Sequence, residues 1–323
     1  MDYANLPGTS LKISRLSLGT MTFGGQTNEE DSLAILDYAF EQGVNFWDTA
    51  NIYTGGESER ITGKALKGRR DEIILATKVF SSMSGKMNDQ GLSRRAILSA
   101  VDASLKRLDT DYIDLYYLHS PDYETDIRET LDTMDSLVRA GKVRYIGISN
   151  YAAWQAADML AVCGQNGYAK PVFSQNIFNL ITRAAQAEML PFLRAHNMGM
   201  TVYNPIAGGL LTGKHKPGTP GEGTRFALNT NYFNRYWTQE NFSAVEQLTV
   251  IAQAQGMNLL EMSMKWCLAQ SGVASVISGV SKLSQLSQNI KAVEGDSLSQ
   301  KTLDGCDAVW NGLTVGRRFP YNR

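Results

Sequence analysis

Short apolar runs alternate with amphipathic segments along most of the chain. The runs are too short for helices, and most are rich in Ile, Val, Leu or Tyr, as buried strands are. The amphipathic segments have the helical spacing of apolar residues, with Ser93 as an expected N-cap and Gly141 as an expected C-cap. The expected strands are 16–18, 44–47, 73–77, 113–118, 143–148, 172–174, 199–203 and 275–278, and the expected helices are 32–42, 93–108, 127–140, 152–163, 186–196, 241–255, 259–270 and 282–292.

Eight strands that alternate with helices predict a parallel sheet, because parallel neighbours need helical crossovers. Eight is also the number that closes a (β/α)8 barrel, a TIM barrel. The rival is an open doubly wound sheet, which usually carries a GxGxxG sequence after its first strand. Here the first run is followed by 19–25, GTMTFGG, which does not fit that pattern. The barrel is therefore the preferred α/β fold.

Three additions to the barrel are expected, and we treat residues 1–323 as one domain. Residues 2–13, within an N-terminal cap at 1–15, are expected to form a β-hairpin. Residues 206–240 are expected to form a long loop after strand seven, on the catalytic face of the barrel. Residues 297–323 are expected to hold a final helix near 299–311 and a basic tail around Arg317 and Arg318.

The composition of the chain mainly argues against certain classes of partner, location and site. The formal net charge is −1 over 323 residues, which gives no electrostatic argument for a nucleic acid or an acidic membrane as partner. No apolar stretch reaches the ~20 residues of a membrane helix, and no secretory signal is visible, so the cytoplasm is the expected location. Three widely spaced cysteines and three histidines without a metal-binding pattern predict free thiols and no metal site: Cys163, Cys267, Cys306, His119, His196 and His215.

Polar residues or glycines follow almost every expected strand, at the rim where barrel enzymes hold their active sites. Each residue alone is more readily explained as a cap, a surface lysine or a structural histidine, but together they converge on one rim. The candidates are Asp48 with Tyr53, Lys78, His119, Ser149 with Asn150, Gln175, Tyr203 with Asn204, and Gly279.

Four of these residues form a coherent chemical set. Tyr53 is a weak acid with an ordinary pKa of ~10, and a neighbouring Lys78 ammonium lowers the pKa of that phenol. Asp48 can hold the lysine in place, and His119 can donate a hydrogen bond to a substrate oxygen. Such a set suits an oxygen that gains negative charge when a carbonyl accepts hydride. Because no side chain supplies hydride, a nicotinamide cofactor is implied.

The chain resembles the aldo-keto reductase family from Leu16 to Asn289. The resemblance is closest to the aryl-alcohol dehydrogenase, sugar-phosphate reductase and potassium-channel β-subunit-like branches. The matching segments are LGTM at 18–21, NFWDTA at 45–50 with Tyr53, GESE at 56–59, ATK at 76–78, DLY at 114–116 with His119, KVRYIGISN at 142–150 and LLTGK at 210–214.

The resemblance implies a role for each matching residue. Tyr53 would be the proton donor, Lys78 would modify its pKa, Asp48 would pair with the lysine, and His119 would orient the substrate. The resemblance also implies residues that would contact each part of NADP(H): the nicotinamide, the pyrophosphate, the 2′-phosphate and the adenine. The implied set is Thr20, Met21, Asp48, Ser149, Asn150, Gln175, Tyr203, Asn204, Pro205, Gly213, Lys214, Arg225, Gly279, Ser281, Gln285, Gln288 and Asn289.

Three positions depart from the commonest family pattern: Asn204 replaces a serine, Gln288 a glutamate and Phe178 a tyrosine. None belongs to the four-residue set, so they bear on cofactor affinity rather than on activity. The stretch 208–214 resembles a P-loop, but His215 stands where magnesium binding needs Ser or Thr.

The sequence thus predicts an NADPH-dependent reductase of small-molecule aldehydes or ketones, reversible with the alcohol. The alternative is a nicotinamide-binding regulatory or partner subunit with slow activity. Neither the natural substrate nor the oligomeric state follows from the sequence. The expected substrate pocket is aromatic and consists of Phe23, Trp47, Phe80, Tyr232 and Trp237.

Overall fold

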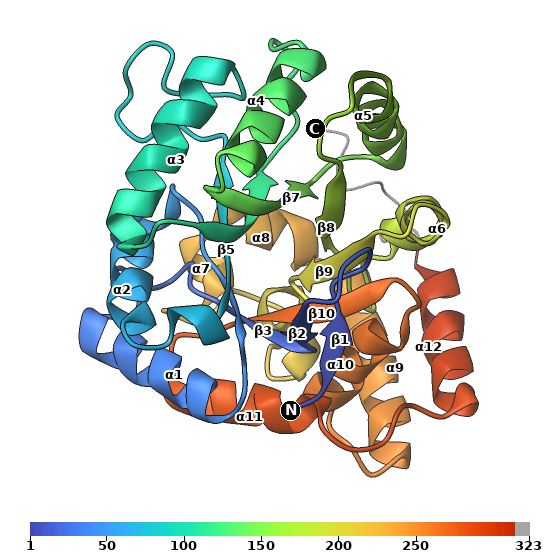
Figure 1. Ribbon diagram of the computed structural model, residues 1–323. Helices are drawn as coiled ribbons and strands as arrows, with labels where there is room; N and C mark the ends of the chain where they lie inside the picture. Colours follow the sequence, from blue (N-terminus) through green and yellow to red (C-terminus); the bar gives the residue numbers. More distant parts are fainter. Residues whose placement is uncertain (314–323) are drawn as a thin grey trace.

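Eight parallel strands close into a barrel in the computed structural model, which describes residues 1–313. The strands follow one another in chain order around the barrel, and β10 closes it by pairing with both β3 and β9. The predicted (β/α)8 fold is confirmed (Figure 1). The barrel strands are β3 (Leu16–Gly19), β4 (Phe46–Asp48), β5 (Ile74–Val79), β6 (Ile113–Leu118), β7 (Val143–Ser149), β8 (Pro171–Ile177), β9 (Gly199–Tyr203) and β10 (Val273–Gly279).

The predicted N-terminal hairpin is also confirmed. Strands β1 (Tyr3–Asn5) and β2 (Lys12–Ser14) pair antiparallel, with Tyr3 opposite Ser14. In Figure 1 the hairpin lies in front of the barrel, whereas the short helices α7 (Arg225–Leu228) and α8 (Thr230–Tyr236) lie behind it. The two additions therefore cover opposite ends of the barrel.

In the described part of the chain, ten further helices cover the outside or the rims of the barrel: α1 (Glu29–Glu41), α2 (Glu57–Leu66), α3 (Arg94–Leu108), α4 (Ile127–Arg139), α5 (Ala153–Asn166), α6 (Met189–Ala195), α9 (Gln239–Ala254), α10 (Leu259–Ala269), α11 (Leu283–Val293) and α12 (Gln300–Gly312). Short 3-10 turns are η1 (Tyr53–Gly56), η2 (Arg70–Glu72), η3 (Ala184–Gln186) and η4 (Ala207–Thr212).

Local signals set several helix ends. The Ser93 hydroxyl accepts a hydrogen bond from the Ala96 amide at the start of α3, as its N-cap position predicts. Gly141 follows the end of α4 with φ +73°, the left-handed conformation that ends many helices. The first expected helix starts earlier than expected, because the Asn28 side chain caps α1 and the acidic residues after it belong to the first turn.

Two parts of the chain differ from the prediction. Helix α2 was not expected, because buried polar residues interrupt its apolar pattern. Its buried side consists of Ser58, Glu59, Ile61, Thr62, Gly63, Ala65 and Leu66. Residues 206–240 are not one long loop: they contain η4, α7 and α8 and lead into α9. An aromatic cluster gives this segment a small core of its own, in which the Trp237 ring lies 4.8 Å from Phe226 and 5.0 Å from Phe242.

Successive side chains along each strand point to opposite faces of the barrel wall, so the hydrophobic core has two parts. One set, including Trp47 and Leu75, packs outward against the helices. The other set, including Phe46, Tyr117 and Phe173, fills the barrel interior and contacts Leu6 and Ile13 of the hairpin region. The strand period of two therefore directs Phe46 and Asp48 inward and Trp47 outward.

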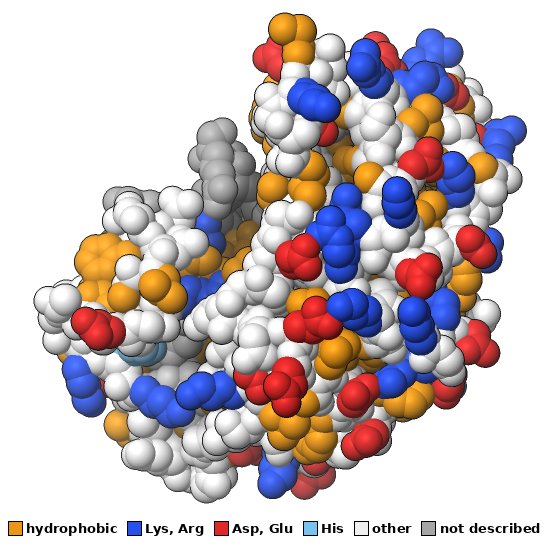
Figure 2. Space-filling view, turned by 90° about the vertical axis from the view of Figure 1, so that its left-hand side faces the viewer, with side chains coloured by type: hydrophobic (Ala, Val, Ile, Leu, Met, Phe, Trp, Pro, Cys, Tyr) orange, Lys and Arg blue, Asp and Glu red, His pale blue; other side chains and the backbone are white. Residues whose placement is uncertain are grey.

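Charged side chains of both signs are intermixed over the helices on the face shown in Figure 2. Within residues 1–313, no helix combines the length and the apolar character needed to cross a membrane. The basic tail expected around Arg317 and Arg318 lies outside the described residues.

Candidate active site

The four candidate catalytic residues come from neighbouring elements at one rim of the barrel. Asp48 ends β4, Lys78 lies in β5, His119 follows β6, and Tyr53 begins η1. The Lys78 Nζ atom lies 2.5 Å from Asp48 Oδ1 and 3.4 Å from Tyr53 Oη. The Tyr53 and His119 rings meet edge to face, with centroids 6.1 Å apart. The structure therefore brings all four together, and we refer to them as the tetrad.

Lys78 is fully buried and fully hydrogen-bonded. Besides Asp48 and Tyr53, its ammonium donates to the Thr49 carbonyl oxygen over 2.7 Å. Burial opposes its charge, but Asp48, through its charge and its hydrogen bond, and Tyr53 outweigh burial and raise the pKa of Lys78. Lys78 is thus an ammonium at neutral pH, fixed beside the Tyr53 hydroxyl.

The pKa of Tyr53 was expected to be lowered by Lys78, but its net shift is in the opposite direction. Burial raises the pKa of Tyr53 more than the Lys78 ammonium lowers it, so the net direction is upward. The lysine acts with the expected sign, but burial exceeds it. Tyr53 is consequently a protonated phenol at neutral pH, held against the group that stabilises its phenolate.

His119 is held in its neutral form. Burial, helped by the nearby Lys78 charge, lowers the pKa of His119 to about 3. Its Nδ1 atom is buried without a hydrogen-bond partner. A neutral imidazole can orient a substrate oxygen by one hydrogen bond, but it is not the acid of this site.

Gln175, Ser149 and Asn150 surround the tetrad in a linked arrangement. Gln175 Nε2 donates to the second oxygen of Asp48 over 2.7 Å, and the Ser149 hydroxyl donates to the Gln175 carbonyl over 3.0 Å. Asn150 Nδ2 donates to the His119 carbonyl over 3.0 Å. The family resemblance implies that these residues contact a nicotinamide carboxamide; in this structure the Gln175 amide contacts Asp48.

The expected pyrophosphate path begins beside this group. Tyr203 donates to Asn150 Oδ1 over 2.8 Å, and the next residue, Asn204, has φ +56°. The Asn204 Nδ2 atom is buried and has no partner, whereas its Oδ1 accepts from the Tyr232 hydroxyl over 3.0 Å. Asn204 therefore holds a buried hydrogen-bond donor ready for an acceptor, and Pro205, also buried, follows it.

The expected phosphate cations lie on the segment after η4. Lys214 is exposed and follows Gly213, whose φ is +72°. The Arg225 guanidinium lies over the Tyr232 ring, 5.0 Å from its centroid. Within residues 1–313, neither cation forms an ion pair with a carboxylate, so both retain charge for an anion.

The expected adenine end lies at the start of α11. Gly279 is exposed, and a Cβ atom added there would meet no atom within 4 Å. The Ser281 amide donates to Gln285 Oε1 over 2.9 Å, and Gln288 is exposed. Asn289 differs, because it is 5% exposed and its amide donates to Ser278.

Thr20 and Met21 lie on the loop that follows β3. Thr20 is fully buried and Met21 is 39% exposed. Of the two, Met21 is therefore the one that is accessible from solvent.

The expected substrate residues divide into two groups. Phe80, Tyr232 and Trp237 are partly exposed. Phe23 and Trp47 are 0% exposed and belong to the core between the barrel and the helices. This burial contradicts their expected place in the substrate pocket. The alternation that directs Asp48 inward directs Trp47 outward, and Phe23 packs into the core from the loop after β3. Trp47 Nε1 donates to the Val44 carbonyl, which confirms this packing position.

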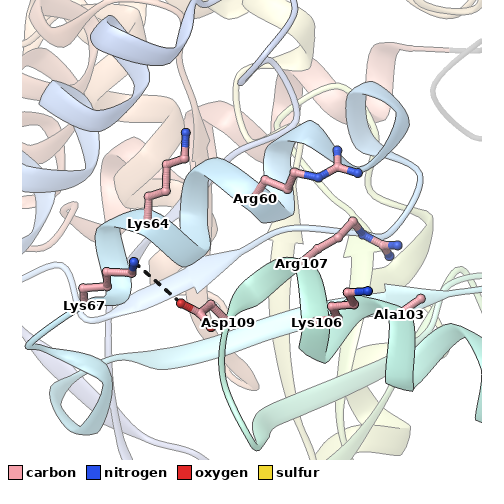
Figure 3. A pocket seen from close by; sticks show the side chains of 7 residues that line it. All are labelled: Arg60, Lys64, Lys67, Ala103, Lys106, Arg107 and Asp109. Carbon is pink, nitrogen blue, oxygen red and sulfur yellow. Dashed lines mark ion pairs between the residues drawn. The ribbon is translucent and has the colours of Figure 1, made fainter.

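A hollow of about 510 Å³ lies elsewhere, between α2 and α3 (Figure 3). Its cations face carboxylates: Lys67 lies 3.7 Å from Asp109, and Arg107 Nε lies 2.6 Å from Glu59. We assign no ligand to it. Its lining residues are Arg60, Lys64, Lys67, Ala103, Lys106, Arg107 and Asp109.

Two buried polar residues behind the tetrad were given no role by the sequence. Ser58 and Glu59 are both 0% exposed and lie in the first turn of α2. The only signal for them was their place in the family-like segment 56–59. Within residues 1–313, no three His, Cys, Asp or Glu side chains are grouped in a way that could hold a metal ion.

Comparison with known proteins gives consistent results. The sequence model of the aldo/keto reductase family matches residues 15–311. A probable voltage-gated potassium channel subunit beta of Arabidopsis thaliana is 38% identical over 91% of this chain and 92% of its own length. Aflatoxin B1 aldehyde reductase member 2 of Rattus norvegicus is 33% identical over 91% of this chain and 84% of its own. An uncharacterized oxidoreductase of Bacillus subtilis (strain 168) is 36% identical over 91% of each chain. The barrel, the tetrad and these matches together show that the chain belongs to the aldo/keto reductase family of oxidoreductases.

Proposed function

We propose that the protein is an NADPH-dependent carbonyl reductase that converts an aldehyde or ketone reversibly to its alcohol, with Tyr53 as proton donor. One observation carries the proposal: a protonated Tyr53 contacts a buried Lys78 ammonium, which Asp48 and the Thr49 carbonyl hold in place. Such a pair suits a reaction in which a proton is delivered to an oxygen as negative charge develops on it.

The residues at the rim fit a nicotinamide dinucleotide. Asn204 offers a buried donor without a partner, Lys214 and Arg225 offer cations for a phosphate, and Gly279 leaves open space beside the start of α11. Bound there, the cofactor supplies the hydride that no side chain can provide. Ser149, Asn150, Gln175 and Tyr203 would hold its reactive end, and Ser281, Gln285 and Gln288 its adenine end.

The chain's own groups then have distinct tasks. The Tyr53 hydroxyl donates its proton to the substrate oxygen while the carbonyl carbon receives hydride, so a phenolate and an alcohol result. Lys78 stabilises that phenolate until water returns the proton. Neutral His119 donates a hydrogen bond that orients the same oxygen. Asp48 contributes by keeping the ammonium in place.

Aromatic side chains favour an apolar or ring-bearing carbonyl. Phe80 and Tyr232 are partly exposed, and Tyr232 also contacts Asn204 and Arg225 of the proposed cofactor site. The rat relative is named an aflatoxin B1 aldehyde reductase, in line with an aldehyde as substrate.

The direct test mixes purified protein with NADPH and a panel of aromatic, aliphatic and sugar-derived carbonyls. We expect loss of NADPH absorbance with at least one class and little with Tyr53→Phe. No turnover across the whole panel would contradict the proposal.

A second function is favoured by the names of two plant relatives, each a probable potassium channel subunit beta. A chain with that role would bind NADPH with normal affinity but turn over slowly on every carbonyl. The complete tetrad favours catalysis, and the same panel, combined with a binding measurement, separates the two functions.

A further inference from the structure

Ser58 lies directly behind the tetrad, in the first turn of the unexpected helix α2. Its side chain is 0% exposed, and its hydroxyl contacts three oxygen atoms. Thr20 Oγ1 lies 2.7 Å away, the Thr20 carbonyl oxygen 2.8 Å and Thr49 Oγ1 2.9 Å. Thr20 and Thr49 are likewise 0% exposed, so no solvent can replace any of these bonds.

These contacts use the whole bonding capacity of the Ser58 hydroxyl. A serine hydroxyl has one proton to donate and two lone pairs to accept with. Ser58 donates to the Thr20 carbonyl and accepts from the hydroxyls of Thr20 and Thr49. Removing it would leave buried hydroxyls without partners, a condition that folded proteins rarely tolerate.

Each partner of Ser58 leads to a tetrad residue. The Thr49 carbonyl accepts from Lys78 over 2.7 Å, and the Thr20 backbone amide donates to the Asp48 carbonyl over 3.0 Å. The Ser58 hydroxyl thus ties together the two backbone segments that hold the lysine and its carboxylate.

The backbone of Ser58 is tied to the segment that carries Tyr53. The Ser58 amide donates to Thr54 Oγ1 over 3.1 Å, and Thr54 itself donates to the Phe23 carbonyl over 2.6 Å. Thr54 has φ +49°, an unusual conformation for a threonine that these two bonds maintain. Ser58 is therefore joined to both sides of the Lys78–Tyr53 contact.

We propose that Ser58 is a positioning residue of the tetrad, whose hydroxyl sets the distance between the Lys78 ammonium and the Tyr53 hydroxyl. The expected change in kcat rests on the proposed function. The distance between Lys78 and Tyr53 does not, because it is a property of the protein without substrate or cofactor.

Thr62 provides a matched control on the same helix. It is also 0% exposed, and its hydroxyl donates only to the Ser58 carbonyl, one turn back along α2, over 2.7 Å. Thr62→Val removes a buried hydroxyl with little change in volume but leaves the bonds to Thr20 and Thr49 intact. It should cost stability without altering the tetrad.

The experiment compares Ser58→Ala with Thr62→Val in two measurements. The first is the titration of Tyr53 in the cofactor-free protein by NMR with 13C-labelled tyrosine, where Tyr53→Phe identifies the signal among the 14 tyrosines. In Ser58→Ala, Lys78 stabilises the phenolate less, so Tyr53 should titrate higher by about half a pH unit or more. The second is steady-state reduction, where kcat should fall about tenfold and the KM for the carbonyl should change by less than about threefold.

The outcomes are distinct. An unchanged Tyr53 titration in Ser58→Ala, or an equal change in Thr62→Val, would overturn the inference. If the wild-type protein reduces no carbonyl, the proposed function fails, but the titration still decides the role of Ser58. If Ser58→Ala does not fold, Thr49→Val removes one of the three bonds at constant volume, and a smaller upward change in the same titration is expected.

Discussion

The tetrad and the segment 214–238 both carry charged groups of the proposed reaction, but these groups differ in burial and in the number of their contacts. Lys78 is fully buried, and Asp48, Thr49 and Tyr53 all contact its ammonium. Lys214 is exposed, and Arg225 contacts the Tyr232 ring and hydroxyl. The barrel fixes the groups that need a precise distance, whereas the cations that need only opposite charge lie on a separate segment. This difference predicts that changes in the first region alter the chemical step and changes in the second alter binding.

The largest effect is expected for Tyr53→Phe. Removal of the proposed proton donor should lower kcat by about a thousandfold, within the range of general acid catalysis, while the Kd for NADPH stays nearly constant. Single-turnover reduction and calorimetric titration measure the two quantities. A large loss of NADPH affinity would contradict the separation of the two regions.

The next effect is expected for Lys78→Met, which leaves the Asp48 carboxylate buried without its cation. Breaking a buried pair in this way costs about 3–5 kcal/mol, so the free energy of unfolding should fall by that order, together with at least a hundredfold in kcat. Urea unfolding and steady-state kinetics provide the measurements. The matched control Lys214→Met should leave the free energy of unfolding almost unchanged, since Lys214 is exposed.

A smaller effect, confined to binding, is expected for Arg225→Ala. Loss of a charge-assisted contact costs about 1.5 kcal/mol, which corresponds to roughly a tenfold higher Kd for NADPH. The Kd for NADH, which lacks the 2′-phosphate, serves as the internal control and should change much less. Equal weakening of both cofactors would place Arg225 away from the phosphate.

The effect that is smallest at neutral pH is the protonation of His119, which gains importance only as the pH is lowered. The pKa of His119 is about 3 in the folded protein and about 6.5 when unfolded, so between these values the unfolded state binds the extra proton. Stability should therefore fall as the pH falls from about 6.5 towards 3, by at most ~1.4 kcal/mol per pH unit from this residue. His119→Gln should unfold with a shallower pH dependence, measured as the midpoint of urea unfolding. Parallel curves for the two proteins would show that His119 is not buried in its neutral form.

Sequence patterns were sufficient for the barrel and the tetrad because both leave local signals. The apolar runs and the polar residues that end them predicted β4, β5 and β6 and placed Asp48, Lys78 and His119 at one rim. Helix α2 was missed because Ser58, Glu59 and Thr62 interrupt the apolar pattern of its buried side, and a hydroxyl cluster such as that of Ser58 has no period to detect. The inclusion of Trp47 in the pocket failed for a different reason: an aromatic residue beside a catalytic one in a strand points to the opposite face.

The N-terminal hairpin closes the end of the barrel opposite to the tetrad. Leu6 and Ile13 close the floor against Phe46 and Phe173, and Pro7 approaches Gly199 so closely that a Cβ atom there would lie 2.7 Å from the proline ring. A chain without residues 1–14 would expose the inside of the barrel to water, although it would still contain all four residues of the tetrad. Thermal robustness can thus be engineered at the floor and substrate preference at the rim, each with little interference from the other.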